Sequence, residues 1–267
     1  MGHRHSIMSL AFSMLGALAC SMAMAQSCSR QSPRHTVALV ELYTSEGCSS
    51  CPPADRWLSG LGKSGVGADE VIPLALHVDY WDALGWKDRF ADSRFSERQR
   101  ALSRLAGRRV VYTPEVFLNL REFGGWDSAA QFRQAVKAIN ARPAGADIRL
   151  TLGAASRAQL PVRASFAVKS GAAPVRAQAF IVVYEDRLST PVAAGENRGA
   201  TLRHDHVVRH WAGPLELRGG SAEFDAVIAL DPRSNPGNLA VAAFVQDSES
   251  REVLQATALG VCEAKKS

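Results

Sequence analysis

The stretch VALVELYTSEGCSSCPP, residues 37–53, combines a short apolar run with a Cys-x-x-Cys motif. The run Val37–Tyr43 is almost continuously apolar, which is typical of a strand buried on both faces of a sheet. Pro52 follows the second cysteine, and proline is favoured in the first turn of a helix. The stretch therefore predicts a buried strand, a turn that carries Cys48 and Cys51, and a helix that begins at the motif.

The spacing of the two cysteines suits dithiol and disulfide chemistry. Residues three apart in the first turn of a helix share a face, so the two sulfurs can reach disulfide distance. The helix N-terminus stabilises a thiolate, which makes Cys48 the candidate nucleophile and Cys51 the resolving thiol. Two alternatives stay open. The first is half of a zinc knuckle, which would need a second pair of ligands. The second is a purely structural disulfide, which would stabilise the fold little because the loop it closes is so short.

Outward from this motif the pattern of apolar residues changes once along the chain. Up to Asn140 the predicted order is strand, helix, strand, helix, strand, strand, helix, which is the thioredoxin order, whereas residues 148–258 repeat with the two-residue period of strands. A cluster of helix and strand breakers separates the two parts. We predict an α/β fold class, with a thioredoxin-like domain over residues 36–142 and a C-terminal all-β, sandwich-like subdomain over residues 146–262.

Three further residues join the two cysteines as catalytic candidates. Thr113-Pro114 stands directly before a predicted strand, where a cis-proline would face the dithiol and the backbone before it could pair with an extended substrate. An ordinary trans proline at a strand start is the alternative. Glu41 alternates with apolar residues, so it is either buried beneath the cysteines as a proton acceptor for the resolving thiol or exposed at the strand edge.

The segment after the second predicted strand is rich in polar and aromatic side chains. In a parallel sheet, functional groups gather beyond the carboxyl ends of strands, so this segment should flank the cysteines. We predict that it binds substrate through His77, Asp79, Trp81 and Trp86. The alternative is that the tryptophans cover the core and the aspartates cap a turn.

Charge and histidine content exclude some partners. The net charge is +5, but the arginines are scattered and are not clustered with stacking aromatics, so we expect no nucleic-acid binding. His204, His206 and His210 have the composition of a metal site, yet only the first two would share a strand face. We interpret them as surface histidines and predict no metal site and no cofactor.

The first residues have the pattern of an export signal. Residues 1–25 comprise a short basic segment, an apolar run and a small-residue end, which predicts a cleaved signal peptide. A permanent anchor is the weaker alternative because the run is short of the ~20 apolar residues that a span needs. We therefore expect a periplasmic or secreted protein without a stable membrane span, in an oxidising compartment.

Signal cleavage would leave four cysteines, two of them at opposite ends of the mature chain. A structural disulfide between Cys28 and Cys262 would close a very long loop and contribute about 4–5 kcal/mol in the chain-entropy model. Chain termini often lie close together, which favours this pairing. The alternative is two isolated thiols.

Two long strings carry a family resemblance: VELYTSEGCSSCPPAD at residues 40–55 and HVDYWDALGWKD at residues 77–88. Together with residues 112–114, 195–197 and 206–208 they resemble the exported family catalogued as domain of unknown function 1223. The resemblance covers almost the whole mature chain. It implies a thioredoxin-like domain followed by an all-β subdomain, and it implies no function.

The motif, its context and the export signal together favour a thiol–disulfide oxidoreductase. It would exchange disulfides with a protein or small-molecule thiol substrate through Cys48 and Cys51, and a redox partner would reset the pair. The alternative is a soft-metal protein or metallochaperone, in which the reduced cysteines, with His77, hold Cu(I). A third hypothesis is a binding module whose β-subdomain recognises a partner.

Overall fold

The computed structural model of the chain describes residues 1–2, 27–169 and 176–262. The predicted signal peptide lies outside these residues, except for its first two. The described helices are α1 (Pro52–Gly60), α2 (Ser93–Leu105) and α3 (Ala129–Asn140), with short 3-10 turns η1 (Leu61–Ser64), η2 (Asp82–Leu84) and η3 (Pro236–Asn238). The strands are β1 (Cys28–Gln31), β2 (Ala38–Thr44), β3 (Val71–His77), β4 (Glu115–Leu118), β5 (Arg121–Glu122), β6 (Ala146–Leu152), β7 (Gln159–Val168), β8 (Ala177–Glu185), β9 (Leu188–Pro191), β10 (Thr201–His204), β11 (Val207–Glu216), β12 (Ser221–Ala229), β13 (Leu239–Asp247) and β14 (Glu252–Gly260).

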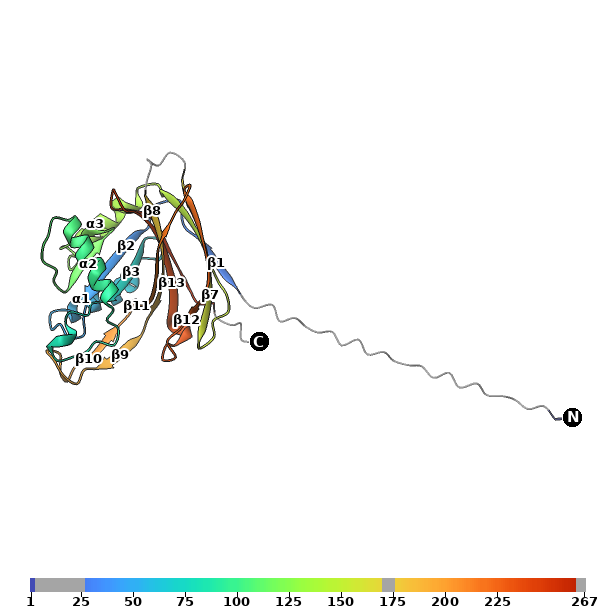
Figure 1. The fold of residues 1–267 in the computed structure, drawn as a ribbon, viewed down its shortest axis with the longest axis horizontal. Coiled ribbons are helices and arrows are strands. Elements are labelled where there is room, and N and C mark those ends of the chain that lie inside the picture. The colour runs from blue at the N-terminus through green and yellow to red at the C-terminus, as the bar shows by residue number, and fades with distance from the viewer. Residues whose placement is uncertain (3–26, 170–175, 263–267) are drawn as a thin grey trace.

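The described strands form three sheets (Figure 1). The largest has eight strands in the order β14-β13-β8-β11-β3-β2-β4-β5, the second has the order β1-β6-β7-β12, and β10 pairs with β9. Within the large sheet β2 runs parallel to β3, and β11 runs parallel to β3 through the pair Val207 and Ala75. The other neighbours in that sheet are antiparallel. Strands from both parts of the chain therefore belong to one sheet.

The predicted fold class, a thioredoxin-like α/β domain with a C-terminal all-β subdomain, is wrong. The described chain is mostly strand, and β2 to β5 do not form a sheet of their own. An edge strand has unpaired backbone N–H and C=O groups, and any other strand of the chain that can reach this edge can form hydrogen bonds with them. Here β11, from the part expected to form a separate sandwich, pairs with that edge of β3. The result is a single mixed sheet that continues from one part of the chain into the other.

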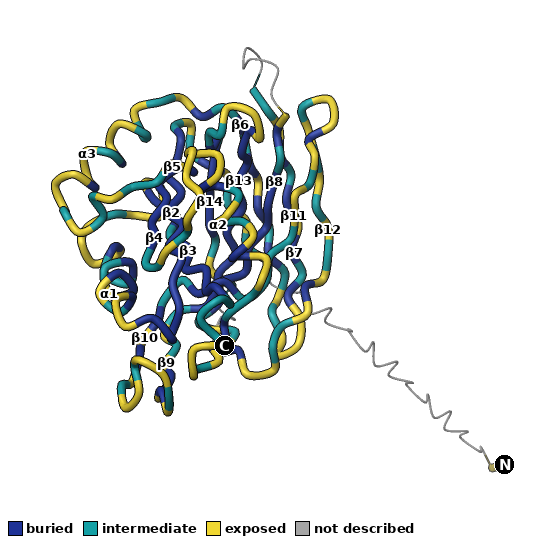
Figure 2. Tube along the Cα trace, turned by 60° about the vertical axis from the view of Figure 1, so that its left-hand side comes forward, coloured by how far each residue is buried: buried dark blue, intermediate teal, exposed yellow. Residues whose placement is uncertain are grey.

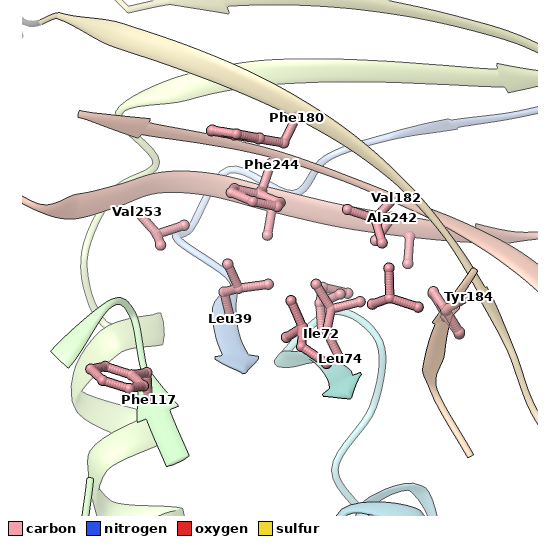
Figure 3. Packing of buried hydrophobic residues seen from close by; sticks show 14 of the residues in the cluster. Leu39, Ile72, Leu74, Phe117, Phe180, Val182, Tyr184, Ala242, Phe244 and Val253 are labelled. Carbon is pink, nitrogen blue, oxygen red and sulfur yellow. The ribbon is translucent and has the colours of Figure 1, made fainter. Parts of the chain in front are cut away.

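The two faces of the eight-stranded sheet bury different partners. On one face, side chains of the sheet's own strands, among them β2, β3, β8, β13 and β14, pack with one another and with α2. This cluster includes Leu39, Leu74, Phe180 and Phe244, with the last two rings stacked (Figure 3). The opposite face is covered by α1 and α3 at the β2 and β4 end and by the four-stranded sheet at the β8 and β13 end. Figure 2 shows the buried stretches of β2, β3, β8 and β13 in the middle of the molecule, with exposed loops around them. The cysteine motif belongs to the α1 face.

Local sequence explains how α1 begins. Pro52 and Pro53 occupy its first positions, where the missing N–H groups have no helical partner to lose, and Cys51 is the N-cap. The β9–β10 hairpin lies beside α1 (Figure 1). Its loop, residues 192–200, thereby reaches the cysteine turn. Among the described residues, no helix is long and apolar enough to cross a membrane.

Candidate functional site

Cys48 and Cys51 form a disulfide at the start of α1. Their sulfurs are 2.15 Å apart and their Cα atoms 5.4 Å apart. The backbone N–H of Cys51 donates to the carbonyl of Cys48 at 3.3 Å, and that of Asp55 donates to the carbonyl of Cys51 at 3.1 Å. Both cysteines are fully buried, although Ser49 and Ser50 between them are exposed. The pair is therefore held in the turn that leads into α1, with both sulfurs buried and the two connecting residues exposed.

Thr113 and Trp81 lie against this turn. The Thr113–Pro114 peptide bond is cis. The carbonyl of Thr113 accepts a hydrogen bond from Oγ of Ser50 at 3.3 Å, and that hydroxyl contacts Sγ of Cys48 at 3.3 Å. Nε1 of Trp81 donates to Oγ1 of Thr113 at 2.8 Å. The cysteine turn, the segment before β4 and the segment after β3 thus meet at one place.

The other predicted substrate-binding residues point in different directions. Nε1 of Trp86 donates to Oε2 of Glu46, two residues before Cys48, at 3.0 Å. The carboxylate of Asp79 accepts from Oγ of Ser96 on α2. His77 is fully buried. The structure therefore brings the tryptophans to the cysteine turn, directs Asp79 to α2 and places His77 inside the protein.

Glu41 lies on the face of β2 opposite the cysteines. It is 1% exposed, and both of its carboxylate oxygens accept from the guanidinium of Arg98, the shortest contact being 2.6 Å. The hydroxyl of Tyr43 donates to the same carboxylate at 2.7 Å. Burial, followed by the charge of Glu41, raises the pKa of Tyr43 well above its ordinary value. Glu41 is thus engaged in a buried ion pair with α2 and is not brought to Cys51.

On the α1 face, five buried titratable side chains lie together. We call them the histidine cluster: Glu46, Asp55, His77, Asp88 and His204. Nδ1 of His77 contacts Oδ2 of Asp88 at 2.6 Å. The two nitrogens of His204 face carboxylates on opposite sides, Oε1 of Glu46 at 3.4 Å and Oδ2 of Asp55 at 3.7 Å, and its ring lies 5.1 Å from that of His77. The cluster joins the cysteine turn, α1, the end of β3 and β10.

Several polar atoms of this cluster lack a hydrogen bond. Among the described residues, Oε1 of Glu46, Oδ2 of Asp55, Nε2 of His77 and both ring nitrogens of His204 are buried without a hydrogen-bond partner. Asp88, in contrast, also accepts from the backbone N–H groups of Glu46 and Phe90 at 2.8 and 2.9 Å. An unpartnered buried polar group is costly, which makes each such atom a candidate for function. These atoms therefore mark the cluster as a candidate functional site.

The pKa values within the cluster are shifted in opposite directions. Burial raises the pKa of Asp55, although His204 and His77 act against this shift. Burial would also raise the pKa of Asp88, but the charge and hydrogen bond of His77 outweigh it and lower the pKa. For His77, burial lowers the pKa, and Asp88 more than compensates, so its pKa is raised. Asp88 and His77 thus form an ion pair, whereas Asp55 retains its proton to higher pH than an exposed aspartate.

The loop between β9 and β10 forms hydrogen bonds with the backbone of the cysteine turn. Nδ2 of Asn197 donates to the carbonyls of Glu46 and Cys48 at 2.9 and 3.0 Å. Oε2 of Glu196 accepts from the backbone N–H of Ser49 at 3.0 Å. Gly195 has φ +72°, and a Cβ there would lie 3.0 Å from Cβ of Trp86, so this close approach requires glycine. We call residues 195–197 the clasp.

A family model described as a protein of unknown function, DUF1223, matches residues 39–246. The chain belongs to the DUF1223 family. The DUF1223 chain is similar in fold to protein AGR_C_4864 from Agrobacterium tumefaciens, with 24% identity, a TM-score of 0.58 and coverage of 88% of this chain and 99% of that one. It is also similar to HBP35 of Porphyromonas gingivalis, with 16% identity, a TM-score of 0.67 and coverage of 88% and 79%. No curated protein matches.

Sequence reasoning missed most of the histidine cluster of this DUF1223 chain. His204 was interpreted as a surface residue, but it is 2% exposed. Glu46, Asp55 and Asp88 lie within the two strings that carry the family resemblance, and the clasp lies in a third matching segment. The position of these three carboxylates inside the family-like strings was the signal in the sequence that could have identified them as site residues. Within the described ranges, no group of three or more His, Cys, Asp or Glu side chains is placed to hold a metal ion.

The second disulfide of the DUF1223 chain joins Cys28 to Cys262 across a sequence separation of 234. The sulfurs are 2.01 Å apart. Cys28 begins β1, which pairs with β6, and Cys262 lies just after β14. Both cysteines are half-buried and pack against the apolar cluster between the two larger sheets. This bridge therefore ties the two ends of the folded chain together.

Proposed function

We propose that this chain is an exported thiol–disulfide oxidoreductase whose reactive pair is Cys48 and Cys51. The observation that carries the proposal is a buried disulfide at a helix N-terminus, with a carboxylic acid of raised pKa one helical turn further on, at Asp55. Perturbed titratable groups gather at functional sites because proton transfer needs them. A bridge that only stabilised the fold would gain nothing from such neighbours.

The proposed reaction is a two-step exchange. A substrate thiolate attacks Sγ of Cys48, the bond between Cys48 and Cys51 breaks, and its electron pair stays on the sulfur of Cys51. A second substrate thiolate then attacks the mixed disulfide, which releases the substrate as a disulfide and leaves Cys48 reduced. In the reverse direction the reduced pair reduces a protein or small-molecule disulfide. A redox partner returns the pair to its starting state.

Asp55 supplies the proton in this scheme. Cys51 and Asp55 are four residues apart at the start of α1, so their side chains share a face of the helix. The sulfur of Cys51 becomes a thiolate when the disulfide opens. Burial disfavours this charged form, so transfer of a proton to the sulfur is favourable. Asp55 is the acid of the histidine cluster whose raised pKa keeps its proton available. His204 contacts both Asp55 and Glu46 and can pass a proton between them.

The position of Thr113 and Trp81 against the cysteine turn supports a role for these residues in substrate binding. The Thr113 carbonyl is linked to Cys48 through the hydroxyl of Ser50, so the backbone before Pro114 lies next to the reactive sulfur. An extended substrate can add its backbone to such a segment as a short strand. We therefore assign the segment before Pro114 to substrate positioning.

The decisive experiment traps the mixed disulfide. In Cys51→Ala the intermediate on Cys48 cannot be resolved, so partners should accumulate as complexes that dissociate in dithiothreitol. The matched control, Cys48→Ala, should trap nothing, because the attacking sulfur is absent. The purified wild-type pair should also equilibrate with glutathione. No trapped complex and no exchange with glutathione would refute the oxidoreductase proposal.

The same preparations test the soft-metal alternative. Reduced wild-type protein would be titrated with Cu(I) beside Cys48→Ser. Tight stoichiometric binding that this substitution abolishes, in a protein without exchange activity, would favour metal handling. Weak binding together with exchange would favour the oxidoreductase.

Export is part of the proposal. Two disulfides are typical of oxidising compartments, and the sequence of residues 1–25 has the pattern of a signal peptide. Cell fractionation should find the protein outside the cytoplasm, with an N-terminus at Gln26. Recovery of the full-length chain in the cytoplasm would contradict export.

A further inference from the structure

The clasp places a negative charge next to Cys48. Oε2 of Glu196 accepts from the backbone N–H of Ser49, one residue beyond the reactive sulfur. Hydrogen bonding by Ser49, first through its side chain and then through its backbone N–H, lowers the pKa of Glu196, so the carboxylate is ionised at neutral pH. Asn197 fixes the clasp through the carbonyls of Glu46 and Cys48. The charge is thereby held in position and does not hang on a freely moving side chain.

A reagent that attacks Cys48 has to approach near this charge. Both sulfurs are buried, so the turn must open locally before a thiolate can reach Sγ. In the described part of the chain, Glu196 and Asn197 are the side chains from outside the turn that hydrogen-bond the backbone of Cys48 and Ser49. Of the other ionisable groups on the turn, α1 and the β9–β10 hairpin, Glu46, Asp55 and His204 are buried. Arg56, Arg198 and Arg203 are exposed, but in the described part of the chain none of these three hydrogen-bonds the backbone of Cys48 or Ser49. Glu196 is exposed.

We propose that Glu196 is a specificity-determining residue that disfavours anionic thiols at Cys48, so that the physiological partner presents a neutral or positively charged thiol. The inference rests on the proposed exchange reaction. Like charges repel across water by an amount that depends on distance and salt, and a partly screened unit charge at this range changes a rate by roughly threefold to tenfold. The carboxylate also occupies the backbone N–H of Ser49, in the turn before α1, which would otherwise be free to stabilise an incoming anion.

The test compares three small thiols of similar size and different charge. These are 2-mercaptoethanesulfonate, 2-mercaptoethanol and cysteamine, and each reduces the oxidised full-length protein. Two thiols lose two electrons and become one disulfide, while the bond between Cys48 and Cys51 opens to two thiols. Each rate is expressed per thiolate and divided by the rate of the same thiolate with 2-hydroxyethyl disulfide. This correction leaves the contribution of the protein.

In the wild type, we expect cysteamine to react about fivefold faster than the sulfonate at low salt, and the ratio should shrink at high salt. Glu196→Gln should bring the ratio close to one. The glutamine carbonyl can still accept from Ser49, so the substitution removes the charge and retains the hydrogen bond. The control Glu223→Gln, at an exposed position on β12, should keep the wild-type ratio.

A second variant tests position separately from charge. Asn197→Ala keeps the carboxylate of Glu196 but removes both hydrogen bonds that fix the clasp. The ratio of the cysteamine rate to the sulfonate rate should therefore fall, and the remaining difference between the two rates should still shrink at high salt. A wild-type ratio retained in both Glu196→Gln and Asn197→Ala would overturn the inference and leave the exchange reaction intact. Absence of exchange with all three thiols would instead contradict the proposed function, and the inference with it.

Discussion

The two disulfides of this chain have opposite surroundings. Cys48–Cys51 spans a sequence separation of 3, is fully buried and has the histidine cluster of buried acids and imidazoles beside it. Cys28–Cys262 spans a separation of 234, is half-buried and packs against apolar side chains. The bond is chemically the same in both. What differs is the length of chain that each closes and the presence of groups that can exchange protons.

This difference separates stability from reactivity. A long closed loop removes much conformational freedom from the unfolded chain, whereas a short one removes little. Proton transfer, in contrast, needs a titratable neighbour, and the short bridge has Asp55 one helical turn away. We therefore expect the terminal bridge to serve folding and the helical bridge to serve chemistry. Four variants test this contrast.

The largest effect should follow removal of the terminal bridge. The double substitution Cys28→Ser and Cys262→Ser should lower the free energy of unfolding by about 5 kcal/mol, because the unfolded chain regains the freedom of a very long loop. Urea denaturation measures this loss. The exchange rate of the remaining pair should not change, and a large drop in that rate would show that the two bridges are coupled.

Breaking the ion pair of the histidine cluster should come next. Asp88→Asn removes the charge that faces His77 in a fully buried site and should cost about 3 kcal/mol at neutral pH. The lowered pKa of Asp88 stabilises the fold above its ordinary value of 3.8 and ceases to do so as the pH falls through the lowered value. The raised pKa of His77 stabilises the fold below 6.5 and ceases to do so as the pH rises through the raised value.

The difference between wild type and Asp88→Asn should therefore be greatest between these two limits. Urea denaturation across a pH series measures it. The exposed substitution Asp225→Asn, on β12, is the control and should show no comparable pH dependence. A constant difference at every pH would mean that packing, and not charge, accounts for the loss.

Removal of the helical bridge should have a smaller effect on stability and a complete effect on exchange. Cys48→Ser with Cys51→Ser opens a loop of a few residues, so the chain-entropy model gives about 2 kcal/mol. Thiol exchange by the purified protein should disappear. A loss of stability as large as that of the terminal double variant would erase the distinction between the two bridges.

The smallest energetic effect should come from Asp55→Asn. We expect exchange to slow about tenfold, because the acid that protonates Cys51 is lost. The raised pKa of Asp55 stabilises the fold at low pH and ceases to do so as the pH rises through the raised value. The variant should therefore be no less stable than the wild type at high pH. Stopped-flow exchange and urea denaturation measure the two effects, and an unchanged exchange rate would remove Asp55 from the mechanism.

The contrast between the two disulfides was partly visible in the sequence. The C-x-x-C spacing, the buried strand before it and Pro52 after it predicted a cysteine turn at a helix start, because these are local features of the backbone. The fold class could not be predicted in this way. A two-residue period tells which residues of a strand share a face, but it does not tell which strand lies alongside, and the pairing of β11 with β3 joins segments far apart in the chain.

The residues of the candidate site also fall into a group that the sequence could identify and a group that it could not. The cysteines, Trp81, Trp86 and the Thr113-Pro114 step are close enough to recognisable motifs to be selected from sequence. For Glu41 the sequence left two positions open, buried beneath the cysteines or exposed at the strand edge. The side chain is buried, but it faces Arg98 on the side of the sheet opposite the cysteines, because a strand alternates its side chains.

The sequence by itself determined the cysteine turn of Cys48 and Cys51 and the segments around it, because residue spacing in a helix or strand is a local property. The tertiary structure alone decided that His204 and Glu196 belong to the same site. Both come from the β9–β10 hairpin, which is distant from the cysteines in sequence and lies beside the cysteine turn and α1 in the folded chain. Burial and ionisation depend on neighbours in space, and those neighbours exist only in the folded chain.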